Sequence, residues 1–199
     1  MKIIKKYALN NDNHFGRKNR EEYITVHQTG NTDVGADAHA HANYMMNGSP
    51  ATWHFTVSND TVIQHYPTDY SLWHAGDGSG TGNLHSIGIE LCINSDGNYN
   101  QTVETGAKLV EYLMRVKEIP LKRVVQHNRW SGKDCPKQIR AGKNGYTWER
   151  FLNLAKNKPS DTFYRVIIGS YQDRKNADDA LRLANDKGFT DAFILPFKV

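Results

Sequence analysis

The sequence predicts an α/β fold in which helices flank a central mixed β-sheet, followed by a small C-terminal βαβ unit. Five runs rich in Val, Ile, Thr and aromatic residues are typical of strands, and amphipathic segments typical of helices lie between them. A polar, proline-containing stretch then precedes one more strand–helix–strand pattern. Strands mixed with helices in this order favour a single sheet with helices packed against it.

The five predicted strands belong to the first and larger domain, residues 1–156. Asn59-Asp60 separates the second strand from the third and is suited to a hairpin turn, so we expect these two strands to pair. The strands are expected at residues 23–27, 53–58, 61–66, 86–93 and 122–126.

Three helices are expected in the same domain. Residues 36–47 form a short helix that Gly48 closes. Residues 102–118 carry apolar residues at helical spacing, which predicts one buried face. Thr147 is suited to cap a third helix that ends at residue 156.

The end of the chain predicts a second, smaller unit over residues 162–199. Residues 157–161 are polar and contain a proline, which is typical of a linker. Strands are expected at 163–170 and 191–196, with a helix over 173–187 between them. Because a two-stranded unit of this size is marginally stable alone, we expect it to dock on the first domain, to form a homodimer with a second copy, or to belong to a longer chain.

Composition limits the partners that this chain can have. The net charge is +4, and the whole excess lies in residues 1–160, because residues 161–199 carry equal numbers of acidic and basic side chains. A mildly basic body suits an anionic polymer such as a bacterial wall, and the chain lacks the basic run with interleaved aromatics that would favour nucleic acid. With only Cys92 and Cys135, a disulfide scaffold is not expected. The first six residues contain no long apolar segment, so we expect a protein made in the cytoplasm without a signal peptide or a membrane span.

Two histidines and a cysteine provide candidate metal ligands. His27 ends the first predicted strand, His127 ends the last one, and Cys135 follows His127 by eight residues. Zinc binds imidazole nitrogen and thiolate sulfur readily, and a catalytic site leaves its fourth position to water. The pattern therefore favours an open catalytic zinc site, although each histidine taken alone also suits the core or a turn.

Two charged residues are candidates for catalysis, each with a structural alternative. Glu90 stands in an apolar strand, where it either faces solvent on the outer side of the sheet or acts as a general base beside a metal. Lys133 is either a solvated loop residue or a fixed positive charge for the oxyanion of a tetrahedral intermediate. The candidates for lining a sugar or peptide groove, with core packing as the alternative for the tryptophans, are Trp53, Trp73 and His74.

These residues lie in segments that resemble the zinc-dependent N-acetylmuramoyl-L-alanine amidases of the type-2 amidase class, which includes phage endolysins and autolysins. The resemblance implies one zinc ion per chain, held by His27, His127 and Cys135. It also implies Glu90 as the catalytic acid and base and Lys133 as a transition-state residue. The likeness covers roughly residues 1–156, with matching segments in family order at residues 25–29, 53–57, 73–78, 86–90 and 127–136.

The resemblance also implies the reaction and the partner. Members of the class hydrolyse the amide bond between the lactyl group of N-acetylmuramic acid and L-alanine of the stem peptide. Bacterial peptidoglycan is therefore the expected substrate, and the cell wall, reached after release or lysis, is the expected place of action. Residues 164–171, Asn176-Ala177 and residues 187–189 resemble half of a SPOR domain, a module that binds glycan strands. This second resemblance implies a wall-binding or dimerisation role for the C-terminal unit.

Two other functions remain open from the sequence. The chain could recognise peptidoglycan without turnover, although the presence of both Glu90 and Cys135 favours catalysis. Alternatively, Cys135 could act as a nucleophile with His127 as its base and no metal. Pro136 directly after the cysteine, together with the third ligand candidate His27, favours the zinc site over this arrangement.

Overall fold

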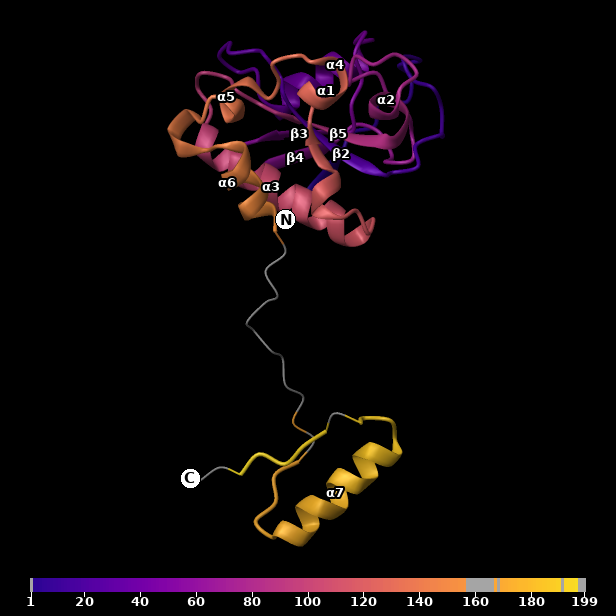
Figure 1. Cartoon of the computed structure of the whole chain (residues 1–199), viewed down its shortest axis with the longest axis vertical. Helices are drawn as coiled ribbons and strands as arrows, with labels where there is room; N and C mark the ends of the chain where they lie inside the picture. The colour runs from indigo at the N-terminus through magenta and orange to yellow at the C-terminus, as the bar shows by residue number, and fades with distance from the viewer. Residues whose placement is uncertain (1, 157–166, 168, 191, 197–199) are drawn as a thin grey trace. The chain divides into compact units, whose positions relative to one another are not determined.

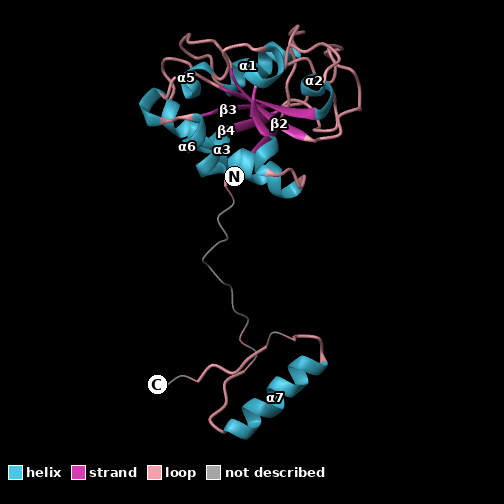
Figure 2. Cartoon of the chain, in the orientation of Figure 1, coloured by secondary structure: helices cyan, strands magenta, loops and turns pink. Residues whose placement is uncertain are grey.

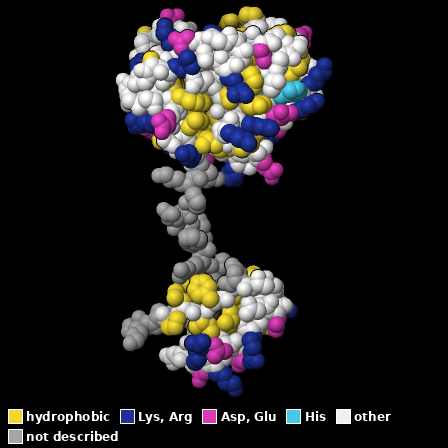
Figure 3. Space-filling view, in the orientation of Figure 1, with side chains coloured by type: hydrophobic (Ala, Val, Ile, Leu, Met, Phe, Trp, Pro, Cys, Tyr) yellow, Lys and Arg dark blue, Asp and Glu magenta, His cyan; other side chains and the backbone are white. Residues whose placement is uncertain are grey.

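The computed structural model describes residues 2–156, 167, 169–190 and 192–196. The chain divides into two compact units, Met1–Asn157 and Lys158–Val199. Among the described residues, no helix is long and apolar enough to cross a membrane. On the face of the first unit seen in Figure 3, acidic and basic side chains are interspersed rather than gathered by sign. That face therefore lacks the basic stripe that is typical of nucleic-acid binding.

A six-stranded sheet forms the centre of the first unit (Figure 1; Figure 2). Its strands are β1 (Ile3–Lys5), β2 (Tyr23–Gln28), β3 (Phe55–Ser58), β4 (Thr61–Gln64), β5 (Ser86–Leu91) and β6 (Val124–Gln126). The order across the sheet is β1-β4-β3-β5-β2-β6. β3 and β4 are antiparallel, as the predicted hairpin requires, and the other neighbouring pairs are parallel.

Helices cover both faces of this sheet, which confirms the predicted fold class. α3 (Tyr99–Val116) and α6 (Trp148–Ala155) pack on one face, and α1 (Ala38–Met46) lies on the other, over β3 and β4 (Figure 1). The shorter elements are α2 (Thr81–His85), α4 (Asn128–Ser131), α5 (Lys137–Arg140) and the 3-10 turns η1 (Leu121–Arg123) and η2 (Lys143–Gly145).

Side chains along β2 and β5 point alternately to the two faces of the sheet, which separates the hydrophobic core from the functional face. Val26 and Ile89 are fully buried in the core that α3 and α6 cover. His27 and Glu90 follow them directly and therefore point to the opposite face of the sheet. The parallel register pairs His27 with Glu90, so the two side chains are neighbours. A slip of one residue in this register would turn both side chains into the core.

The other predicted elements of the first unit are present, and most ends agree within two residues. The helix expected at 102–118 begins earlier, at Tyr99, because the side chain of Asn98 accepts a hydrogen bond from the Gln101 N–H at 3.1 Å and caps it. The sequence did not predict β1 or α2. With three and five residues, they are too short to show a hydrophobic period.

The second unit contains the helix that its sequence predicts. α7 (Arg174–Asp186) begins where the Asp173 side chain accepts a hydrogen bond from the Lys175 N–H at 2.7 Å. Residues 192–196 are not assigned to a strand, but the segment expected to pair with them lies mostly outside the described residues, so the strand expected at 191–196 stays a prediction. The linker 157–161 and most of the strand expected at 163–170 lie outside the described residues. The βαβ arrangement therefore stays a prediction.

Candidate metal centre and active site

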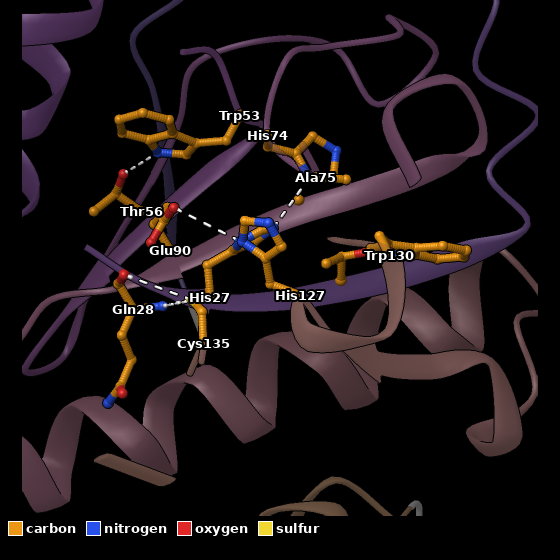
Figure 4. A network of polar contacts seen from close by, with 12 residues as sticks. His27, Gln28, Trp53, Thr56, His74, Ala75, Glu90, His127, Trp130 and Cys135 are labelled. Carbon is orange, nitrogen blue, oxygen red and sulfur yellow. Dashed lines mark hydrogen bonds and ion pairs between the residues drawn. The ribbon is translucent and has the colours of Figure 1, made fainter. Parts of the chain in front are cut away.

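Three buried ligand atoms meet at the carboxyl ends of the parallel strands. They belong to His27 near the end of β2, His127 directly after β6, and Cys135 in the loop between α4 and α5 (Figure 4). All three atoms lie within 4.8 Å of one another, and the two Nδ1 atoms of the histidines are 2.9 Å apart. Ligand sites of open α/β sheets form at this edge, because parallel strands bring their carboxyl ends together.

The loop that carries Cys135 is held closed by Asn128. The Asn128 side chain donates hydrogen bonds to the carbonyls of Gly132 and Lys133 at 2.9 and 3.0 Å, and its N–H donates to the Cys135 carbonyl at 3.1 Å. Gly132 ends α4 with a φ of +74°, a conformation that glycine adopts without strain. The N–H of Gln28 donates to the Cys135 sulfur at 3.5 Å. The thiol is therefore fixed from the β2 side and from its own loop.

Burial sets the protonation states of the three candidate ligands. It lowers the pKa of His27 well below its ordinary value, and it lowers the pKa of His127, with a further contribution from the charge of Lys133. Both imidazoles are therefore neutral at physiological pH, which is the form that binds a metal. Burial, followed by the carboxyl of Glu90, raises the pKa of Cys135 to about 11. The free thiol therefore keeps its proton at neutral pH unless a cation binds to it.

Glu90 lies beside the three ligand atoms rather than in solvent. Its side chain is 14% exposed, and its Oε1 is 4.0 Å from the Nδ1 of His27. Its Oε2 is buried and has no hydrogen-bond partner in the part of the chain that the structure describes. Burial raises the pKa of Glu90 to about 8, and the positive charge of Lys133 opposes this effect. Of the two alternatives for Glu90, the solvated one is therefore excluded, because the side chain is mostly buried.

Lys133 is exposed, yet its charge reaches the buried groups. It lowers the pKa of Glu90 and of Cys135, and it disfavours the protonated form of His27. The hydrogen bonds from Asn128 fix the Lys133 backbone directly before the cysteine. The ammonium group can therefore act on a charge that develops at the ligand centre while its side chain remains open to solvent.

The three candidates for substrate contact differ in accessibility. Trp73 is 39% exposed, and its ring packs against Phe15 with centroids 4.1 Å apart. Trp53 is buried, and its Nε1–H donates to the Thr56 hydroxyl at 2.7 Å, which agrees with the packing alternative. His74 is also buried, and its Nδ1 lies 3.0 Å from the Nε2 of His27. Of the three side chains, Trp73 is therefore the one with a substantially exposed ring.

Sequence reasoning missed the residues that support this centre. Asn128 follows a ligand directly, and an asparagine at the start of a loop is a recognisable turn signal. Asn83 and Gly88 carry no comparable signal. They lie close to the centre because the chain returns to it through the glycine-rich loop and β5.

Neutral imidazoles and a thiol beside a buried carboxyl are typical of the active site of a metal-dependent hydrolase. The model of a protein family described as N-acetylmuramoyl-L-alanine amidase matches residues 17–138, and that of the SPOR domain matches residues 138–196. The chain belongs to the N-acetylmuramoyl-L-alanine amidase family, a family of enzymes.

Relatives and solved structures agree with this assignment. N-acetylmuramoyl-L-alanine amidase CwlH of Bacillus subtilis (strain 168) is 45% identical over 175 residues, which are 86% of this chain and 67% of CwlH. XlyA of the same organism is 48% identical over 130 residues, 65% of this chain and 42% of XlyA. The solved catalytic domain of XlyA superposes with a TM-score of 0.73 at 41% identity, covering 78% of this chain and 100% of that one. PlyL gives a TM-score of 0.69 at 31% identity, covering 78% and 98%. The chain thus spans two thirds of CwlH and less than half of XlyA.

Proposed function

We propose that this chain hydrolyses the amide bond between the lactyl group of N-acetylmuramic acid and L-alanine of the stem peptide, using a water activated at a zinc site. The observation that carries the proposal is the meeting of three metal-binding atoms beside a buried carboxyl, in a chain of this amidase family. Bacterial peptidoglycan is then the substrate, and the cell wall is the place of action.

The residues of the centre fit one zinc ion per chain. A tetrahedral zinc ion with bonds of about 2.0 to 2.3 Å keeps its ligand atoms about 3.3 to 3.6 Å apart. The ligand atoms of His27, His127 and Cys135, within 4.8 Å of one another, need only small rotations to reach that spacing. Two neutral nitrogens and one sulfur are a donor set that zinc prefers over magnesium or calcium. When bound, zinc supplies a water of lowered pKa and polarises a carbonyl group.

Glu90 is the proposed general base and general acid. Its buried oxygen without a partner is free to accept the proton of the attacking water. A pKa near 8 in the metal-free chain falls when a cation binds nearby, so the carboxylate is available at neutral pH. The protonated carboxyl then returns this proton to the leaving alanine nitrogen, which completes cleavage of the amide bond.

Lys133 is the proposed stabiliser of the oxyanion. Attack on the lactyl carbonyl places negative charge on its oxygen, and a fixed ammonium group favours that charge. The positive charge of Lys133 lowers the pKa of both Glu90 and Cys135, and this effect on neighbouring groups supports the role.

The two alternatives fit the site less well. A cysteine nucleophile needs a lowered thiol pKa, whereas burial raises the pKa of Cys135 to about 11. Recognition without turnover needs neither the carboxyl of Glu90, which lies 4.0 Å from His27, nor Lys133, whose charge lowers the pKa of Glu90. The arrangement therefore favours metal-assisted hydrolysis.

Trp73, packed against the half-buried Phe15, offers an exposed aromatic ring for a sugar ring or the lactyl–peptide junction, and the buried Trp53 and His74 have supporting roles in this proposal. The C-terminal unit, over residues 162–199, holds glycan strands or pairs two copies of the chain, as its match to the SPOR domain suggests.

Zinc content and wall hydrolysis, measured on the same preparation before and after chelation, test this function. About one zinc per chain, with new amino-terminal alanine appearing only in the metal-loaded protein, is the expected result. Unchanged alanine release after complete metal removal would refute the zinc mechanism and favour the cysteine nucleophile. Zinc binding and wall binding without alanine release would assign the chain to recognition.

A further inference from the structure

His27 has a second contact on the side of its ring that faces away from the other ligands. Its Nδ1 faces His127 and Glu90, so its Nε2 points in the opposite direction. There Nε2 lies 3.0 Å from the Nδ1 of His74, and the two rings meet edge to face at 87° with centroids 5.1 Å apart (Figure 4). One of the two nitrogens donates and the other accepts.

The ring of His74 packs against the backbone of β5 at a glycine. Gly88 of β5 lies directly beneath it: a Cβ at this position would be 2.9 Å from both Cγ and Nδ1 of His74. The N–H of Gly88 is bonded on its other side to the Nδ1 of His54 at 2.9 Å, so the strand is fixed where the ring packs. Any residue other than glycine would displace the imidazole from its position beside His27.

The backbone that carries His74 is fixed by Asn83. The side-chain oxygen of this buried asparagine accepts hydrogen bonds from the N–H groups of His74 and Ala75, at 2.8 and 2.7 Å. Its amide nitrogen donates to the Gly78 carbonyl at 2.9 Å, and its own N–H donates to Asp77 Oδ1 at 3.1 Å. The His74-Ala75 segment is therefore held independently of the two ligand strands.

The same segment also faces the second histidine ligand. The Ala75 carbonyl raises the pKa of His127, against the lowering by burial. The Nε2 of His127 is buried, has no hydrogen-bond partner among the described residues, and lies 3.5 Å from the position of a Cβ on Gly76, the next residue of the segment. Of the two histidines, His27 is therefore the one whose remote nitrogen contacts this segment through a side chain, while the two Nδ1 atoms face each other.

We propose that the His74-Ala75 segment, held by Asn83, positions the metal-binding His27: His74 Nδ1 accepts the Nε2–H of His27. A proton fixed on Nε2 leaves Nδ1 of His27 with a free lone pair for the metal. Second partners of this kind fix ring orientation, and their loss typically weakens metal binding 10- to 100-fold. This inference rests on the proposed zinc site and makes His74 a positioning residue.

Zinc affinity, measured on the full chain by competition with a chromogenic chelator, tests the proposal. His74→Leu keeps the volume but removes the acceptor, and it should weaken zinc binding about 10- to 100-fold. His74→Asn places an oxygen where Nδ1 stood and should stay within about threefold of the parent chain. His65→Leu, the same change at a buried histidine outside the segment, is the matched control and should leave zinc affinity unchanged.

The outcomes separate this inference from the proposed function. If the parent chain binds zinc but His74→Leu binds it equally well, or His74→Asn is as weak as His74→Leu, the positioning role is overturned while the zinc site stands. If the parent chain binds no zinc, both fall. Nitrogen-15 spectra of the zinc-loaded parent chain give a second test that needs no variant. A proton on Nε2 of His27 supports the proposal, and a proton on Nδ1 of His27 overturns it.

Discussion

Two buried histidines outside the ligand set should make the fold sensitive to acid. His54 accepts the Gly88 N–H on Nδ1 at 2.9 Å, and its Nε2 lies 3.0 Å from the Tyr70 carbonyl. His65 contacts the Thr56 hydroxyl through Nε2 at 2.8 Å. Burial lowers the pKa of His54 from 6.5 to about 4 and that of His65 from 6.5 to about 3. The folded chain therefore keeps both rings neutral at pH values at which the unfolded chain protonates them.

The sign and size of the effect follow from this difference. Because the pKa is lower in the folded chain, the full stability is present above pH 6.5 and is lost as the pH falls through the folded values. At 1.36 kcal/mol per pKa unit, complete protonation would remove about 3 kcal/mol for His54 and about 5 kcal/mol for His65. Between pH 6 and 5, where the unfolded rings are already charged, each histidine contributes a slope of about 1 kcal/mol per pH unit.

Urea unfolding of the chelator-treated chain, at several pH values from 7 to 5, measures this slope. His65→Gln should reduce the dependence of the unfolding free energy on pH by about 1 kcal/mol per pH unit, because one proton fewer is taken up on unfolding. His39→Gln, at an exposed position, is the matched control and should have the slope of the parent chain. Equal slopes for His65→Gln and the parent chain would refute the burial argument.

Three further predictions concern the active site and the core. Glu90→Gln should lower kcat by about 10²- to 10⁴-fold while zinc content, measured by metal analysis, stays near one per chain; full activity would exclude Glu90 as the base. Lys133→Met should lower kcat about 10²-fold, measured as alanine release at saturating wall substrate, because it removes a charge that acts on the oxyanion; an effect on KM alone would contradict that role. Phe151→Ala, in the core between α6 and α3, should lower the unfolding free energy by about 3 to 5 kcal/mol in urea titrations. Leu154→Ala, on the same helix at a side chain that is 41% exposed, should change it by less than about 1 kcal/mol, and equal losses would contradict the assigned core face.

The sequence predicted the two histidines of the candidate triad because both lie at strand ends, and Cys135 because it follows His127 within one loop. His27 and His127 each follow an apolar run, and parallel pairing of β2 with β6 then brings the strand ends together. The strand around Glu90 was also predictable, since alternating Ile87, Ile89 and Leu91 indicate one buried face. These features can be recognised in short stretches of sequence. The sheet topology adds only the information that these stretches lie close together.

Other features depend on contacts between distant segments, and local patterns do not encode them. The contact of His74 with His27 joins residues 47 apart, and it exists because a glycine-rich loop returns over the functional face. Glu90, which an alternating strand pattern alone places in solvent, is mostly buried next to His27. The burial of Trp53 likewise depends on Tyr66 and Leu72, which pack against it from later segments. The sequence indicated Trp53, Trp73 and His74 as candidates for substrate contact. Only tertiary packing shows that the first and last are buried and that Trp73 is exposed.

Burial disfavours charged side chains at this centre in the metal-free chain, and the same burial favours the binding of a cation. Without a metal, Glu90 has a raised pKa, the thiol of Cys135 keeps its proton and His27 stays neutral, so the ligand face carries little charge of its own. A divalent cation in this low-dielectric environment attracts a carboxylate and a thiolate more strongly than it would in water. Glu90 and Cys135, which burial keeps protonated, can therefore lose their protons and interact with the cation when it binds. Metal binding is then coupled to proton release. In the proposed centre, His74 supports His27 as a neutral ring and adds no negative charge, which leaves Glu90 as the proposed carboxyl for proton exchange with the substrate.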